Sequence, residues 1–199
     1  MTTTERLNSL SGRLVHRGLL IGSGALWLGL AVVLFAWSGR FSLAAVAAAC
    51  GVPAPDVAFA PAAAETTAFV EACGESGLAA YRDLQVVDLL YPAAGALFLM
   101  VVLAFLLRRL MPGVGWLAFL PLGAALGDYL ENVAAWALIT VGPVGAPWAA
   151  SILQAGSAVK VVLSWASWLL VSGLLVALAV RAVSTRGAST AQAPPSAVR

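Results

Sequence analysis

Three polar side chains interrupt a long apolar stretch near the middle of the chain. Asp128, Glu131 and Asn132 lie inside the apolar run 116–141. Their i+3 and i+4 spacing places all three on one face of a helix. A charged group at the centre of a membrane helix costs about 2.5–3.5 kcal/mol even on insertion scales, so these groups need partners. Carboxylates in such a place are suited to cation binding or proton transfer.

Two other apolar segments carry polar residues at the same helical spacing. These stripes are Tyr81, Gln85, Asp88 and Pro92 on one segment, and Gln154, Ser157, Lys160, Ser164 and Ser167 on the other. Stripes on three helices predict a polar pocket between the second, third and fourth membrane spans. The residues expected to bind a ligand there are Asp88, Tyr91, Asp128, Glu131, Asn132 and Lys160.

The predicted pocket contains more negative than positive charge. Three carboxylates, from Asp88, Asp128 and Glu131, face the single ammonium of Lys160. Depths counted at about 1.5 Å per residue from the helix ends match Lys160 with Glu131 as an ion pair. At least one of Asp88 and Asp128 is then expected to be protonated near neutral pH or matched by a cation.

The composition excludes a water-soluble fold. The 199 residues are 61% hydrophobic and only 10% charged, whereas soluble domains carry about 25% charged residues. Runs of about 20 apolar residues are long enough to cross a bilayer, and their lack of alternation excludes a β-barrel. We therefore predict an all-α, antiparallel four-helix transmembrane bundle. Its spans are 18–38, 79–107, 114–141 and 149–180, with a polar N-terminal tail 1–17, a loop 39–78 and a disordered tail 181–199.

The arginines predict the orientation of this bundle in the membrane. Most of them, including Arg13, Arg108 and Arg181, fall on the side of the two termini. The positive-inside rule therefore predicts cytoplasmic termini and an extracytoplasmic loop 39–78. Cys50 and Cys73 lie in that loop, where an oxidising compartment favours a disulfide. Their wide spacing favours a structural bond over a redox-active pair, which typically has two residues between its cysteines.

The sequence also resembles a known group of proteins. The segment 77–92, which ends Asp-Leu-Leu-Tyr-Pro, is followed by Asp-Tyr-Leu-Glu-Asn at 128–132 and by the lone Lys160. This pattern resembles uncharacterised bacterial four-span integral membrane proteins over most of residues 60–170. The resemblance implies a multi-pass protein of the bacterial cytoplasmic (inner) membrane. That group has no established activity, so the resemblance implies a topology and a set of residues but no reaction.

These observations leave several functions open. The leading hypothesis is a pocket that binds a small amphiphilic or cationic ligand. An enzyme that modifies a lipid or isoprenoid would use Asp128 or Glu131 as acid and base. A proton-coupled transporter subunit and a purely structural membrane protein are also consistent with the pattern. No phosphate-binding loop, metal-ligand spacing or basic stripe is present, so we expect no cofactor, metal or nucleic acid. The expected partners are membrane lipids and a second copy of the chain.

Overall fold

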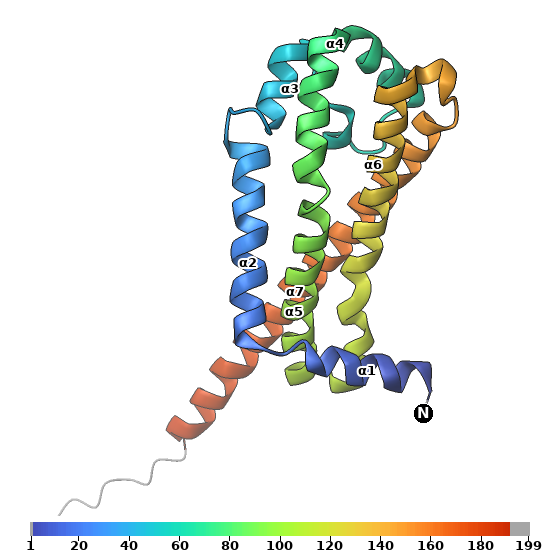
Figure 1. The fold of residues 1–199 in the computed structure, drawn as a ribbon. Helices are drawn as coiled ribbons and strands as arrows, with labels where there is room; N and C mark the ends of the chain where they lie inside the picture. Colours follow the sequence, from blue (N-terminus) through green and yellow to red (C-terminus); the bar gives the residue numbers. More distant parts are fainter. Residues whose placement is uncertain (1, 192–199) are drawn as a thin grey trace, which may run out of the picture.

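The structure is a computed structural model that describes residues 2–191, and these residues form helices and no strand. Four helical stretches are long and apolar enough to cross a membrane, which confirms the predicted all-helical fold with four candidate spans. The chain rises through α2, returns through α4 and α5, rises again through α6 and descends through α7 (Figure 1). The main helices are α1 Thr3–Arg13, α2 Arg17–Ala31, α3 Leu43–Cys50, α4 Ala63–Asp88, α5 Tyr91–Leu110, α6 Leu120–Gly145 and α7 Ala149–Ala191.

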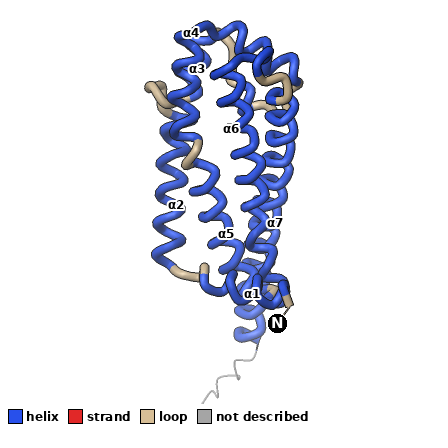
Figure 2. Tube along the Cα trace, turned by 45° about the vertical axis from the view of Figure 1, so that its right-hand side comes forward, coloured by secondary structure: helices blue, strands red, loops and turns tan. Residues whose placement is uncertain are grey.

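Short helical turns and loops complete the connections between these helices. A π-helical turn, Val32–Ala36, extends α2, and the 3₁₀ helix Pro112–Phe119 leads from α5 into α6. The loop after α3 contains a single 3₁₀ turn, Pro55–Val57. Most of the chain is therefore helical, with loops mainly at the ends of the bundle and one short break between α4 and α5 (Figure 2).

The N-terminal residues, which the sequence predicts to be a polar tail, form a helix that packs against the bundle. A capping box starts α1, because Glu5 N–H donates to Thr2 Oγ1 at 3.2 Å and Thr2 N–H donates to Glu5 Oε2 at 2.7 Å. Such reciprocal bonds satisfy amide groups that a helix start otherwise leaves open. Asn8 then fixes α1 to the turn before α6, through Gly113 O at 3.1 Å and the Trp116 N–H at 2.8 Å. Helix α1 thus lies across one end of the bundle (Figure 1).

The second membrane span is broken in the middle. The expected span 79–107 consists of the end of α4 and most of α5, separated by Leu89 and Leu90. Pro92 causes this break, because proline has no amide hydrogen to donate to the carbonyl one turn before it. Helix α4 also begins well before residue 79, and its first part bends at Gly74, where φ is +60°. The break places Asp88 at the last position of one helix and Tyr91 at the first position of the next.

The other end of the chain also differs from its prediction. Helix α7 continues to Ala191, so residues 181–191 of the expected disordered tail are helical. No proline interrupts this segment, and the first proline after it is Pro194, so the backbone hydrogen bonds of α7 can continue past residue 180. The remainder of the expected tail, 192–199, lies outside the described residues.

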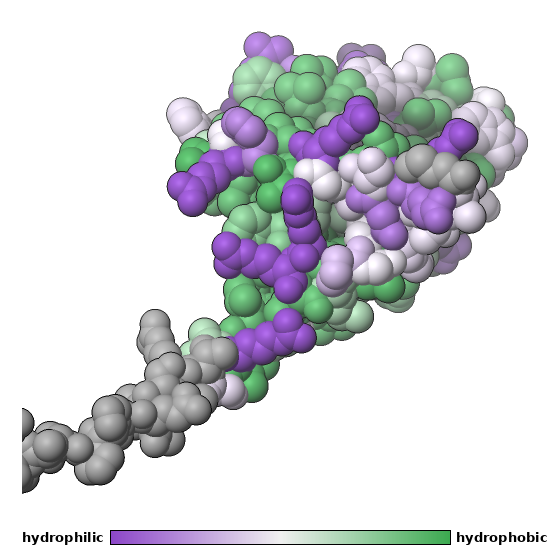
Figure 3. Space-filling view, turned by 90° about the horizontal axis from the view of Figure 1, so that it is seen from below, coloured by the Kyte–Doolittle hydropathy of each residue, from purple (hydrophilic) through white to green (hydrophobic). Residues whose placement is uncertain are grey.

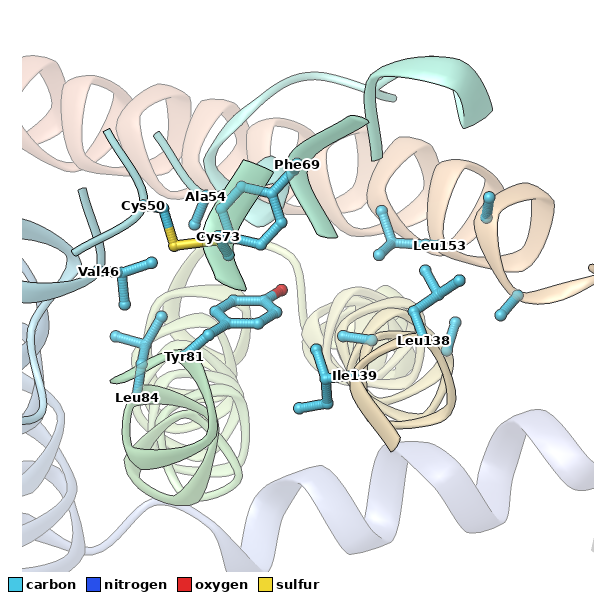
Figure 4. Close-up of a cluster of buried hydrophobic side chains, with 14 of the residues drawn as sticks. Val46, Cys50, Ala54, Phe69, Cys73, Tyr81, Leu84, Leu138, Ile139 and Leu153 are labelled. Carbon is cyan, nitrogen blue, oxygen red and sulfur yellow. A yellow bond between two sulfur atoms is a disulfide. The ribbon is translucent and has the colours of Figure 1, made fainter. Parts of the chain in front are cut away.

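A buried cluster closes the end of the bundle opposite α1. Cys50 at the end of α3 and Cys73 in α4 form a disulfide. Phe69 and Tyr81 meet edge to face beside it, with ring centroids 5.1 Å apart (Figure 4). Gly77 makes this close packing possible, since a Cβ there would lie 2.7 Å from Cys50 Sγ. Tyr81, expected on the pocket stripe, is instead 1% exposed within this core.

Loss of this disulfide has a predictable effect on stability. Replacing both Cys50 and Cys73 with serine should lower the free energy of unfolding by about 3 kcal/mol, because the bond closes a loop of some two dozen residues. Denaturant unfolding in detergent micelles, with and without reductant, measures this effect. Reductant should destabilise the native chain and leave the double variant unchanged, and equal stability of the two chains would contradict the prediction.

Candidate functional site

A cavity of about 310 Å³ lies within the bundle, towards the end that carries α3. Its charged lining consists of Asp88 from α4, Asp128 from α6 and Lys160 from α7. The other lining residues are Leu34, Phe35, Leu43, Val57, Leu84, Tyr91, Val161, Ser164 and Trp165. The cavity therefore combines a small charged region with walls that are mainly apolar and aromatic.

Lys160 forms ion pairs with two of the three intramembrane carboxylates. Its Nζ lies 2.5 Å from Glu131 Oε2 and 3.4 Å from Asp128 Oδ1. The Lys160–Glu131 pair that helix depth predicts is thus confirmed. The Glu131 side chain has no exposed surface, whereas 18% of the Lys160 side chain and 9% of the Asp128 side chain are exposed. Lys160 thus connects a wholly buried carboxylate to one that reaches the cavity.

Two glycines allow α6 and α7 to bring these charges together. A Cβ added to Gly156 would lie 2.7 Å from Gly127 O and 2.8 Å from Glu131 N. A Cβ added to Gly127 would lie 2.7 Å from Lys160 N. These are contacts between backbones, as in membrane helix pairs whose small residues permit close approach. The crossing point of the two helices therefore positions the ion pair.

Four of the six residues expected to bind a ligand line this cavity: Asp88, Tyr91, Asp128 and Lys160. Glu131 and Asn132 are not among its lining residues and are 0% and 1% exposed. Asn132 interacts with the Asp88 side chain, and Glu131 with Lys160. Both residues are therefore buried behind the cavity wall and contact charged groups that line it. The spacing of residues within one helix does not predict this difference.

Several stripe residues on α7 serve the fold rather than the cavity. Ser157 Oγ donates to Ala58 O at 3.0 Å, and Gln154 Nε2 donates to Ala60 O at 3.4 Å. These two hydrogen bonds attach the loop after α3 to α7, and Val57 of this loop lines the cavity. Ser167 is buried and donates to Leu163 O within its own helix at 2.7 Å. Lys160 and Ser164 are the members of the predicted stripe that reach the cavity.

The first span supplies aromatic residues that contact the residues of the cavity. The Tyr91 ring lies 6.4 Å from the Trp27 ring and 5.6 Å from the Phe35 ring, measured between centroids. Trp27 also lines a second cavity of about 100 Å³ with Trp168. Tyr91, Asp128, Lys160 and Ser164 line both cavities, so the polar groups lie between them. The contacts of α2 with the other spans join residues that are distant in sequence. The spacing of residues within α2 therefore does not predict them.

Comparison of the chain with protein-family models, with curated proteins and with solved structures gives no match. Within residues 2–191, no three His, Cys, Asp or Glu side chains are grouped so that they could hold a metal ion. The function is therefore inferred from the charges, walls and position of the cavity.

Proposed function

We propose that this chain is a multi-pass protein of the bacterial inner membrane whose cavity binds a small amphiphilic cation. One observation carries the proposal: Asp88 and Asp128 both line an apolar, aromatic cavity in which Lys160 is the only basic group among the described lining residues. The same Lys160 is also the partner of the buried Glu131. The cavity thus presents carboxylate in excess over ammonium.

The charge balance favours a cation over an anion as the ligand. Three carboxylates and one ammonium leave two negative charges, if all four groups are ionised. Each uncompensated charge within the bilayer costs about 2.5–3.5 kcal/mol on insertion scales. A bound monovalent cation removes one negative charge without disturbing the pair between Lys160 and Glu131. An anionic ligand would instead increase the excess of negative charge.

The walls favour a cation with an apolar body. Tyr91, Phe35 and Trp165 line the cavity, and aromatic faces attract alkylammonium groups by about 0.5–2 kcal/mol. Leu34, Leu84 and other aliphatic side chains cover the remaining surface. A volume of about 310 Å³ is at the lower end of the range for small-molecule sites, about 300–1,000 Å³. An inorganic ion would leave most of this space unfilled.

The arginines support an orientation with both termini in the cytoplasm. Arg13, Arg17, Arg108 and Arg109 lie at or beside the bundle end that α1 covers. The positive-inside rule assigns such an end to the cytoplasm. Leu43 at the start of α3 and Val57 in the loop after α3 line the cavity from the opposite end. In this orientation the cavity lies on the extracytoplasmic side, where an oxidising environment supports the disulfide.

Benzyltrimethylammonium tests the proposal, because neopentylbenzene is its neutral carbon isostere. The cation should quench or shift tryptophan fluorescence of the purified protein in a saturable way, since Trp165 lines the cavity. Neopentylbenzene and the anion benzylsulfonate should bind at least tenfold more weakly. Replacing Asp128 with asparagine should weaken cation binding about tenfold or more, because the quaternary ammonium makes no hydrogen bond and loses the attraction of one negative charge.

The matched control for this variant is Glu71→Gln, which removes an exposed carboxylate of α4 outside the cavity. This control should bind the cation as the native chain does. Equal affinity for the cation and its neutral isostere would contradict the proposal. So would undiminished cation affinity in a chain that carries both Asp88→Asn and Asp128→Asn.

A further inference from the structure

A hollow separate from the two cavities of the candidate site lies at the opposite end of the molecule. It has a volume of about 430 Å³ and lies where α1 crosses the end of α5 and the turn before α6. Its lining residues are Asn8, Ser9, Ser11, Gly12, Arg13, Arg108, Pro112 and Gly115. We call this hollow the α1 groove. Viewed from this end, hydrophilic residues gather on the surface of the molecule (Figure 3).

The α1 groove brings together two arginines that are distant in sequence. Arg13 is the last residue of α1, and Arg108 is in the last turn of α5. Arg108 Nη1 lies 4.0 Å from the position of a Cβ on Gly12, so its guanidinium extends to α1. Both arginines are exposed, and the described residues that line the groove include no carboxylate. Two guanidinium groups thus line the same groove, and none of the described lining residues is acidic.

The floor of the α1 groove is fixed by hydrogen bonds. Asn8 bonds with the backbone of Gly113 and of Trp116. Ser11 is buried and donates to Asn8 O at 2.8 Å. A Cβ on Gly115 would lie 2.7 Å from Ser11 Oγ, so α1 and the turn are in direct contact. The two arginines therefore extend from a rigid junction rather than from a loose terminal segment.

We propose that the α1 groove binds the phosphate headgroup of an anionic phospholipid. The planar guanidinium group matches phosphate oxygens with two parallel hydrogen bonds. Helix α1 lies across the end of the membrane-spanning helices (Figure 1), and the ends of such helices are at the level of the lipid headgroups. Leu10, Met111 and Trp116 are 43–49% exposed beside the groove and provide apolar surface for acyl chains. Basic pockets beside membrane helices recognise lipid headgroups in this way. This site is independent of the cavity and of its ligand.

Native mass spectrometry of the protein in mixed micelles tests the assignment, with phosphatidylglycerol and phosphatidylcholine as probes. The native chain should retain phosphatidylglycerol in preference to phosphatidylcholine. The double variant Arg13→Gln/Arg108→Gln should lose about thirtyfold in phosphatidylglycerol affinity, at roughly fivefold for each basic residue near the membrane surface. The charge-conserving variant Arg13→Lys/Arg108→Lys should retain only part of the preference, because an ammonium keeps the charge but not the two parallel hydrogen bonds of a guanidinium.

Arg6→Gln is the matched control, because Arg6 is an exposed arginine of α1 that does not line the groove. It should bind phosphatidylglycerol as the native chain does, and thermal unfolding checks that each variant is folded. Equal retention of both lipids by the native chain would overturn the proposal. So would equal losses in the Arg6→Gln and double variants. Binding of inorganic phosphate as tightly as phosphatidylglycerol would overturn the assignment to a lipid.

Discussion

Replacing Lys160 with methionine is expected to lower the free energy of unfolding by about 3–5 kcal/mol, the usual cost of removing one partner from a buried ion pair. Lys160 neutralises Glu131, which has no exposed surface, and it also contacts Asp128. The methionine side chain fills similar space but leaves both carboxylates without its positive charge in an apolar environment. Reversible unfolding in bicelles or in mixed detergent measures the difference.

A second substitution distinguishes loss of charge pairing from loss of packing. Combining Lys160→Met with Glu131→Gln should recover a large part of the lost stability, because the amide carries no charge to be compensated. Arg40→Met is the matched control at the surface, where Arg40 pairs with Asp83 and its side chain is 72% exposed. Exposed pairs contribute little, so this control should change stability only slightly. A Lys160→Met chain that is as stable as the Arg40→Met chain would contradict the prediction.

Replacing Gly156 with alanine is expected to destabilise the protein by about 1–3 kcal/mol, the range for overpacking in a close-packed core. The added Cβ would meet Gly127 O at 2.7 Å and Glu131 N at 2.8 Å, and both are backbone atoms that cannot rotate away. Helices α6 and α7 must therefore separate at the level of the ion pair. The separation should also weaken binding of benzyltrimethylammonium, although Gly156 is not a lining residue.

Gly173 provides the control for this prediction on the same helix. A Cβ at Gly173 has no atom within 4 Å, so Gly173→Ala should keep native stability or raise it slightly, since alanine favours helix over glycine. Thermal unfolding and ligand titration of the two variants make the comparison. If Gly156→Ala and Gly173→Ala behave alike, the close contact of α6 and α7 does not position the site.

The sequence predicts the site residues best where a charged residue lies in an apolar segment. Charged groups in apolar helices are costly, so Asp128, Glu131 and Lys160 are recognisable from the sequence alone. Equal depth then predicts the pair of Lys160 with Glu131, which the structure contains. The four apolar spans follow from length and composition, because a chain must be apolar over about 20 residues to cross a bilayer.

The sequence predicts least well which side chains line the cavity together. Glu131 and Asp128 lie on one helical face, yet one is fully buried and the other lines the cavity. Gln154 and Ser157 match the polar stripe, yet they bond to the loop that follows α3. These outcomes depend on the rotation of each helix and on the path of a loop. Such features arise from contacts between distant segments, which periodicity within a single helix does not encode.

Locating an amphiphilic cation in a crystal of the protein shows directly whether the cavity binds one. Crystals of the protein soaked with 4-bromobenzyltrimethylammonium give an anomalous bromine signal that marks the ligand without assumptions about its pose. We expect a bromine peak inside the cavity, with the ammonium group beside Asp88 and Asp128, and no such peak in the Asp88→Asn/Asp128→Asn chain. An empty cavity in the native crystals, or a peak of equal height in the double variant, would show that these carboxylates do not bind such a cation.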